Sequence, residues 1–312
     1  MTTGHPPSRV ILHEIGMRDG LQIEKRVVPT ATKLAWLEQL LASGVDIIQV
    51  GSFVHPDKVP QMADTDVLFK ALAEAPGQPR PALSGLVLNE KGLDRALACG
   101  VEHISVGVSA SDTHSRRNTG MTTGEALARI VPIARRASAE GKAVQVSVQS
   151  AFGCGLEGAI PAARVLDIVR AYLDAGLRRI SLADTAGHAL PPQVRDLYGG
   201  VFDLGEGISA ACHFHDTYGL AMANTLAALE AGVIHVESAF GGLGGCPFTA
   251  VTGGNLCTED FAYYLQRSNR RTGVALERLM AVASAASTFF GRPLPGTLHR
   301  IGPIGAPTST RS

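Results

Sequence analysis

Short apolar runs typical of β-strands alternate along the chain with longer segments whose apolar residues recur at helical spacing. In the helical segments, Leu127, Ile130, Val131 and Ala134 follow the i, i+3, i+4, i+7 pattern, and residues 165–173 do the same. The strand-like runs span residues 10–14, 46–51, 82–88, 103–108, 143–149, 179–184, 209–215 and 235–239. This alternation predicts repeated β–α units around a parallel sheet.

Glycine recurs where a predicted helix gives way to the next strand, a position where it adopts the left-handed conformation without strain: Gly44, Gly100, Gly141, Gly176, Gly207 and Gly232. Eight such units predict a (β/α)8 TIM barrel. The alternative, an open doubly wound sheet, would favour a glycine-rich phosphate fingerprint after the first strand, and none is seen. We expect one catalytic domain over residues 1–312. It comprises a barrel (about 10–257), extra C-terminal helices (about 258–290) and a tail (291–312).

The chain has 312 residues, with 28 basic (Lys, Arg) and 28 acidic ones, so its formal net charge is zero. This balance gives no support for binding nucleic acid or a membrane surface. The first residues lack the apolar core of a signal peptide, and no apolar run approaches the length of a membrane span. Five cysteines without paired spacing favour a reduced, cytoplasmic protein.

The segment around His213 and His215 carries the clearest chemical signal. Side chains alternate along a strand, so two histidines two positions apart face the same way and form half of a metal site. The glycine-rich run at residues 241–245 directly precedes Cys246 and Pro247. Such a run can hold a lone cysteine on a loop over that site.

Other polar residues fall where strands of the predicted barrel end, which is where barrel enzymes place their chemistry. They are Arg18 and Asp19 after strand one, Gln49 at the end of strand two, Asp184 at the end of strand six, and Cys246 and Asn255 after strand eight. A carboxylate, two imidazoles and an amide oxygen suit a divalent ion such as Mg, Mn, Co or Zn. The absence of a thiolate cluster argues against a structural zinc.

Each element has a structural alternative. A histidine pair on a strand is more often structural than metal-binding, and Arg18 and Asp19 could form a surface ion pair. Asp184 and Asp216 could cap the helices that follow them, and Cys246 could be an inert thiol. These alternatives do not explain why all the elements fall at one rim of one barrel.

Several segments together resemble the hydroxymethylglutaryl-CoA lyase family, which belongs to the metal-dependent barrel lyases related to Claisen-type synthases. The matching segments are residues 14–22 (EIGMRDGLQ), 52–62 (SFVHPDKVPQM), 180–185 (ISLADT), 213–219 (HFHDTYG), 242–247 (GLGGCP), 254–256 (GNL) and 258–260 (TED). The resemblance covers about residues 10–290, and the GLGGCP loop is specific to the lyase branch.

The resemblance implies retro-Claisen cleavage of a 3-hydroxy-3-methylglutaryl-CoA-like thioester to acetyl-CoA and acetoacetate. A divalent ion, Mg or Mn, would be held by Asp19, His213, His215 and Asn255. Arg18 would face the thioester oxygen, while Cys246, Asp184 and His213 would serve catalysis. Glu14 would brace Arg18, and Gln22 and Gln49 would contact substrate or support the site. A homodimer acting on acyl-CoA is expected.

Gln49 departs from the family, which usually has a glutamate at this point in a Glu-x-x-Ser-Phe context. Glutamine carries no charge and transfers no proton, and its amide donor could bind an extra substrate oxygen. Ile23 also replaces a polar residue. Three alternatives therefore stay open: a lyase for another 3-hydroxyacyl-CoA such as a citramalyl-CoA-like thioester, a condensing acyltransferase, or a metal-binding paralogue without turnover.

Overall fold

Eight parallel strands close into a barrel in the order β1 to β8, and β8 pairs back with β1. The computed structural model describes residues 9–73, 81–245 and 253–305. The (β/α)8 barrel is therefore confirmed, and each strand ends within two residues of its predicted range. The strands are β1 (Ile11–Glu14), β2 (Ile47–Ser52), β3 (Ala82–Leu86), β4 (His103–Ser109), β5 (Ala143–Gln149), β6 (Arg179–Asp184), β7 (Ser209–Phe214) and β8 (His235–Ser238).

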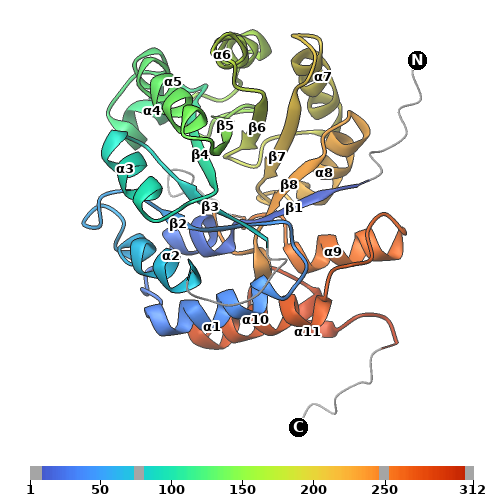
Figure 1. Ribbon diagram of the computed structural model, residues 1–312. Helices are drawn as coiled ribbons and strands as arrows, with labels where there is room; N and C mark the ends of the chain where they lie inside the picture. The colour runs from blue at the N-terminus through green and yellow to red at the C-terminus, as the bar shows by residue number, and fades with distance from the viewer. Residues whose placement is uncertain (1–8, 74–80, 246–252, 306–312) are drawn as a thin grey trace.

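Helices surround the strands (Figure 1). They are α1 (Thr30–Leu41), α2 (Thr65–Ala73), α3 (Glu90–Ala98), α4 (Asp112–Thr119), α5 (Thr123–Ala139), α6 (Ala162–Asp174), α7 (Pro191–Phe202), α8 (Ala221–Glu230), α9 (Thr258–Arg267), α10 (Leu276–Phe290) and α11 (Leu298–Ile301). The glycines predicted to end helices all have φ between 71° and 105°. Thr122 and Glu125 form a capping box that starts α5, where each side chain accepts a hydrogen bond from the other's backbone amide.

The two faces of the strands differ in chemistry. On β4, Ile104 joins the hydrophobic core between strands and helices. Its neighbours His103 and Ser105 point into the barrel, where they meet His13 of β1, with ring centroids 5.5 Å apart, and Gln49 of β2. Barrel interiors are commonly filled by bulky branched residues. Here many of the inward-facing side chains are polar, and such side chains can form a functional site.

The helices after β8 pack behind the loop that follows this strand. In Figure 1, α10 lies beside α1, and the Trp36 ring of α1 meets Phe289 of α10 at 6.0 Å. Trp36 also meets Phe240, just after β8, at 5.8 Å. The backbone amide of Gly296 donates to the Gly241 carbonyl oxygen at 2.9 Å. The C-terminal segment therefore supports the loop that leads to the glycine-rich run.

The segment after residue 290, expected as a tail, contains helix α11, which contacts α9 and α10. Among the described helices, none combines the length and the apolar character that crossing a lipid bilayer requires.

Candidate metal and active site

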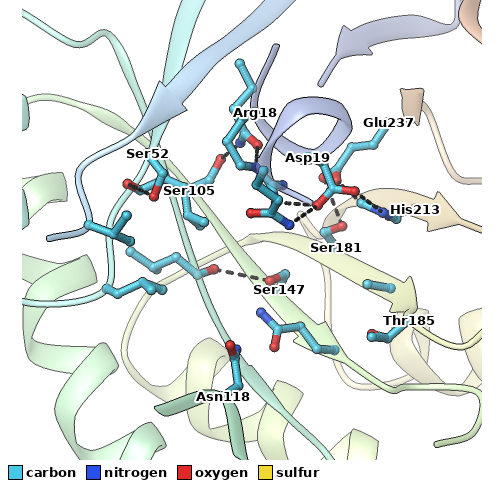
Figure 2. A pocket seen from close by; sticks show the side chains of 18 of the residues that line it. Arg18, Asp19, Ser52, Ser105, Asn118, Ser147, Ser181, Thr185, His213 and Glu237 are labelled. Atoms are coloured by element: carbon cyan, nitrogen blue, oxygen red, sulfur yellow. Dashed lines mark hydrogen bonds and ion pairs between the residues drawn. The ribbon is translucent and has the colours of Figure 1, made fainter. Parts of the chain in front are cut away.

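A cavity of ≈ 380 Å³ lies at the carboxyl-terminal ends of the strands and extends into the barrel. Six of the predicted site residues line it: Arg18, Asp19, Gln22, Gln49, His213 and His215. Figure 2 shows Arg18, Asp19 and His213 gathered on one side, with Ser52 and Ser105 across from them. The structure thus brings together residues that are as much as 197 positions apart in the chain, Arg18 and His215.

Asp19, His213 and His215 form a buried group that can hold a metal ion. Each offers one ligand atom, and these atoms lie within 4.8 Å of one another. The Nε2 atoms of both histidines lie 3.8 Å from Oδ2 of Asp19. The prediction that both histidines face the same way is confirmed, because both line the cavity.

Hydrogen bonds fix which nitrogen of each imidazole faces the group. Nδ1 of His213 lies 2.7 Å from Oε2 of Glu237, and Nδ1 of His215 lies 3.0 Å from the Asp184 carbonyl oxygen. Since both partners are acceptors, Nδ1 carries the proton of each neutral imidazole and Nε2 keeps the lone pair. Both Nε2 atoms are buried and have no partner among the described residues. Burial lowers the pKa of His215 to about 4, which keeps it neutral near pH 7.

Asn255 lies beside this group. Its Nδ2 donates to Oδ2 of Asp19 at 2.8 Å and to the Leu243 carbonyl oxygen at 2.9 Å. Its Oδ1 is buried and has no partner in the described part of the chain. Gly244 has φ +112°, and a Cβ there would lie 2.2 Å from Nδ2 of Asn255, so this approach of the backbone requires glycine. Two imidazole nitrogens, a carboxylate and an amide oxygen fit a divalent ion.

Arg18 lies beside this group on a short π-helix, η1 (Gly16–Gly20), that directly follows β1. Its Nη1 donates to Oδ1 of Asp19, and its Nε donates to Oε1 of Gln49. The two side chains of the ion pair are only 11 % and 8 % exposed, so the surface-pair alternative is wrong. Gln22 also donates to Asp19, at 3.1 Å. Burial opposes ionisation of Asp19, but the charge of Arg18 holds its pKa well below the usual range.

Gln49 lies within β2 rather than at its end, because the register with β3 shifts between Gln49 and Gly51 and the strand continues to Ser52. Its Oε1 accepts from Arg18, and its Nε2 donates to Oγ of Ser105 at 3.0 Å. The amide nitrogen has two N–H groups, and the second faces Oγ of Ser84 at 3.5 Å. The expectation that an amide donor binds a substrate oxygen therefore stays a prediction. Through its Oε1, Gln49 holds the Arg18 guanidinium.

Glu14 does not brace Arg18 in the described structure, which corrects the sequence-based expectation. Its carboxylate accepts from the amides of Gly16 at 2.6 Å and Phe240 at 3.1 Å, and from the Thr258 hydroxyl at 2.5 Å. These contacts join the segments that follow β1 and β8. Burial raises the pKa of Glu14 to about 8.

Asp184 holds the turn after β6. Its carboxylate accepts from the backbone amides of His188 at 2.9 Å and Ala189 at 3.0 Å. Both lie before α7, whose N-cap is Leu190 without a side-chain cap, so the alternative that Asp184 caps the next helix is wrong. Burial raises the pKa of this carboxyl to about 6. Asp216 likewise accepts from the amide of Ala221 at the start of α8, as its own capping alternative predicts. Cys246 lies outside the described residues, so its predicted role stays a prediction.

Sequence reasoning missed Glu237 on β8 and the two residues that hold it, Gln145 and Ser181. The only signal was the alternation of β8, which puts Glu237 on the same face as His235. Its partners come from β5 and β6 across the barrel, and strand alternation alone does not identify such pairs.

Comparisons with known proteins agree with this geometry. The HMGL-like family model matches residues 9–285. A hydroxymethylglutaryl-CoA lyase of Bacillus subtilis (strain 168) is 35% identical over 289 residues, which are 93% of this chain and 96% of that protein. An (R)-citramalyl-CoA lyase of Chloroflexus aurantiacus is 35% identical over 303 residues, 95% of both chains.

A solved structure of an HMG-CoA lyase from Acinetobacter baumannii, in complex with coenzyme A and 3-methylmalate, superposes with a TM-score of 0.90. It has 32% sequence identity and covers 97% of this chain and 98% of its own. With the barrel, the buried Asp–His–His group and a family model that spans most of its length, this chain belongs to the HMGL-like family of hydroxymethylglutaryl-CoA lyases.

Proposed function

We propose that the protein is a divalent-metal-dependent carbon–carbon lyase that cleaves 3-hydroxy-3-methylglutaryl-CoA to acetyl-CoA and acetoacetate. The observation that carries this proposal is the convergence of two unpartnered buried atoms, Nε2 of His213 and Nε2 of His215, on the Asp19 carboxylate. A buried polar atom without a partner costs free energy, so such a cluster is expected where a ligand satisfies it.

When bound, a divalent ion such as Mg²⁺ or Mn²⁺ supplies positive charge that orients the acyl group and makes its tertiary hydroxyl more acidic. Asp19, His213, His215 and Asn255 would hold it. Their hydrogen bonds to neighbouring side chains and backbone keep these ligand atoms in place.

Arg18 stabilises the negative charge that develops on the thioester oxygen during the reaction. The hydroxyl passes its proton to a base, a role we assign to Asp184. The C2–C3 bond then breaks, C3 becomes the carbonyl of the keto acid, and the electron pair of the broken bond moves onto the thioester as its enolate. A guanidinium whose Nε and Nη1 are fixed by Gln49 and Asp19 can direct Nη2, which has no partner among the described residues, at the enolate oxygen. A proton must then reach C2, and we assign this delivery to Cys246 or Asp184.

The decisive experiment measures acetyl-CoA release from a panel of 3-hydroxyacyl thioesters by protein that has been exhaustively chelated and then reloaded with Mg²⁺ or Mn²⁺. We expect cleavage of 3-hydroxy-3-methylglutaryl-CoA only after reloading. Full activity with no metal detected by elemental analysis would contradict the proposal.

A citramalyl-CoA-like thioester is the second candidate, and one observation favours it. Gln49 places a neutral amide beside Arg18, and Ile23 lines the same cavity, so the acyl site is less acidic and more apolar than the family pattern implies. A relative of 35% identity bears the name (R)-citramalyl-CoA lyase. The same thioester panel separates the two substrates, and net synthesis from acetyl-CoA and a 2-oxo acid would instead indicate a condensing enzyme.

We further propose a cytoplasmic homodimer. The described cysteines Cys99, Cys154, Cys212 and Cys257 are free thiols, which suits a reducing compartment. Light scattering of the purified protein would test the dimer.

A further inference from the structure

Glu237 is a buried carboxylate in the middle of the barrel. It lies on β8, inside the sheet, and its side chain is 7 % exposed. Burying a charge is costly unless the group is paired and hydrogen-bonded. A carboxylate at this place therefore needs compensating partners, and their arrangement shows what the carboxylate holds.

Three strands supply those partners. Oε1 of Glu237 accepts from Nε2 of Gln145 on β5 and from Oγ of Ser181 on β6, the latter at 3.1 Å. Oε2 lies 2.7 Å from Nδ1 of His213 on β7. Each oxygen thus has a described partner, and the carboxylate is fixed from two sides. Figure 2 shows Glu237 beside His213, with Ser181 below them.

The bond to His213 decides the chemistry at the other side of that ring. A carboxylate only accepts, so Nδ1 must donate, and Nε2 keeps its lone pair on the side of Asp19, whose Oδ2 is 3.8 Å away. His215 obtains the same arrangement from a backbone carbonyl, that of Asp184. Of the two histidines, His213 alone is oriented by a side chain, so its orientation can be changed by a single substitution.

We propose that Glu237 is a positioning residue of the metal centre, and that its carboxylate, held by Gln145 and Ser181, fixes His213 in the tautomer whose Nε2 can bind the ion. This inference rests on the proposed function for the existence of the metal centre. Acceptors behind ligating histidines fix ring orientation and raise ligand basicity, and their loss commonly costs 10–100-fold in metal affinity.

The test compares Glu237→Leu with Glu237→Gln. Leucine removes the acceptor from His213. Glutamine keeps the shape and can accept from Nδ1 through its own oxygen while it loses the charge. Gln145 can turn its amide over to match, because its Oε1 is buried and has no partner among the described residues. Isothermal titration calorimetry of metal-free protein with Mn²⁺ should show affinity lowered about 100-fold by leucine and about 10-fold by glutamine.

A tautomer readout distinguishes positioning from general support of the fold. In metal-free wild-type protein with ¹⁵N-labelled histidine, at an alkaline pH where the imidazole is neutral, the His213 signals should show a protonated Nδ1 and a lone pair on Nε2. Glu237→Leu should give a mixture of tautomers, whereas Glu237→Gln should keep the wild-type one. If leucine prevents folding, the glutamine variant alone decides through its Mn²⁺ affinity.

His235→Gln is the matched control. His235 lies on the same strand and faces the same interior, but its Nε2 pairs with Oγ of Ser209 at 2.9 Å and not with His213. We expect its Mn²⁺ affinity to equal that of the wild type. Equal weakening in the control, or Glu237 variants that bind Mn²⁺ like the wild type and keep the tautomer, would overturn the inference. Wild-type protein that binds no Mn²⁺ would instead overturn the proposed function.

Discussion

Buried histidines occupy both ends of the barrel interior, and among the described residues only those at one end belong to a group that could hold a metal. At the carboxyl-terminal ends of the strands, the upper end, His213 and His215 each have an acceptor behind Nδ1. Their Nε2 atoms converge on Asp19. At the lower end, His13 and His103 pack edge to face at 5.5 Å, and none of their ring nitrogens has a partner in the described structure. The two pairs of histidines are equally buried, but they differ in their capacity to bind a metal ion. A histidine that binds an ion in this site needs a carboxylate that binds the same ion and an acceptor that fixes its tautomer.

The largest effect should follow from removing the carboxylate that distinguishes the two ends. Asp19→Ala takes away a charged ligand, so Mn²⁺ affinity and turnover should fall by ~100-fold or more. This loss should exceed the one caused by removing a residue that only hydrogen-bonds to a ligand. His103→Asn at the lower end should leave Mn²⁺ affinity unchanged. Calorimetric titration of both metal-free proteins tests this comparison, and an equal loss in His103→Asn would remove the distinction between the two ends.

The next effect concerns the guanidinium at the upper end. Arg18→Lys keeps the charge but loses the planar fork that donates to Asp19 and Gln49 at once. Turnover should fall by ~100-fold, the order expected for losing one oxyanion donor, and kcat should fall more than KM rises. Steady-state kinetics with 3-hydroxy-3-methylglutaryl-CoA gives the split. A lysine variant with normal kcat would assign Arg18 to substrate binding.

The lower end should control stability at acid pH. Burial lowers the pKa of His13 and of His235 to about 4, and it holds the pKa of His103 well below 6.5. Arg179 lowers the three further, and Glu237 opposes it. The unfolded chain therefore binds more protons, so stability is fully present above about pH 6.5 and is lost as the pH falls toward 4.

Urea unfolding of metal-free protein at pH 7 and pH 5 measures this loss. His103→Asn removes one titrating group, so the difference in unfolding free energy between the two pH values should shrink. Mn²⁺ should not reproduce that effect, because the ion binds at the other end of the barrel. An unchanged pH dependence in His103→Asn would show that the lower cluster does not titrate on unfolding.

The sequence was sufficient for the upper end where residues are close in the chain or share a strand. His213 and His215 could be paired by alternation, and Asp19 could be placed by its position after β1. Glu14 was assigned to Arg18 because the two are near in sequence, yet its partners Phe240 and Thr258 follow β8. Contacts across the barrel depend on how the sheet closes and on which inward-facing side chains of different strands then meet, and neither is visible in the sequence of one segment.

The interior rows themselves had a readable pattern that sequence analysis did not use. On β4, His103 and Ser105 alternate with Ile104, whereas strands buried on both faces are commonly continuous apolar runs. Polar residues on the inner face of several strands thus predict a functional interior. They do not say which end binds a ligand, because that depends on the acceptors behind each ring.

The smallest expected effect concerns the choice of substrate. It depends on the amide of Gln49 on β2, which bonds Arg18 at the upper end of the barrel. Gln49 accepts from Nε of Arg18 without carrying charge. In Gln49→Glu, a carboxylate would stand beside the guanidinium, weaken its pull on the thioester oxygen and repel a nearby acyl carboxylate. Substrates whose acyl groups place charge differently should respond differently, by the few-fold to tenfold that about 1 kcal/mol produces.

The measurement is the ratio of kcat/KM for 3-hydroxy-3-methylglutaryl-CoA to that for a citramalyl-CoA thioester. Because a glutamate restores the family pattern, Gln49→Glu should raise the ratio. Mn²⁺ affinity should stay as in the wild type, since Gln49 contacts none of the proposed metal ligands among the described residues. Ser105→Ala is the matched control, because it removes the nearer of the two serine hydroxyls that accept from the Gln49 amide without adding charge, and it should leave the ratio unchanged. If Ser105→Ala shifts the ratio as much as Gln49→Glu, the substrate preference depends on packing at β2 and β4 rather than on charge beside Arg18. If neither variant shifts it, the selecting contacts lie elsewhere in the cavity, with Ile23 the first residue to exchange.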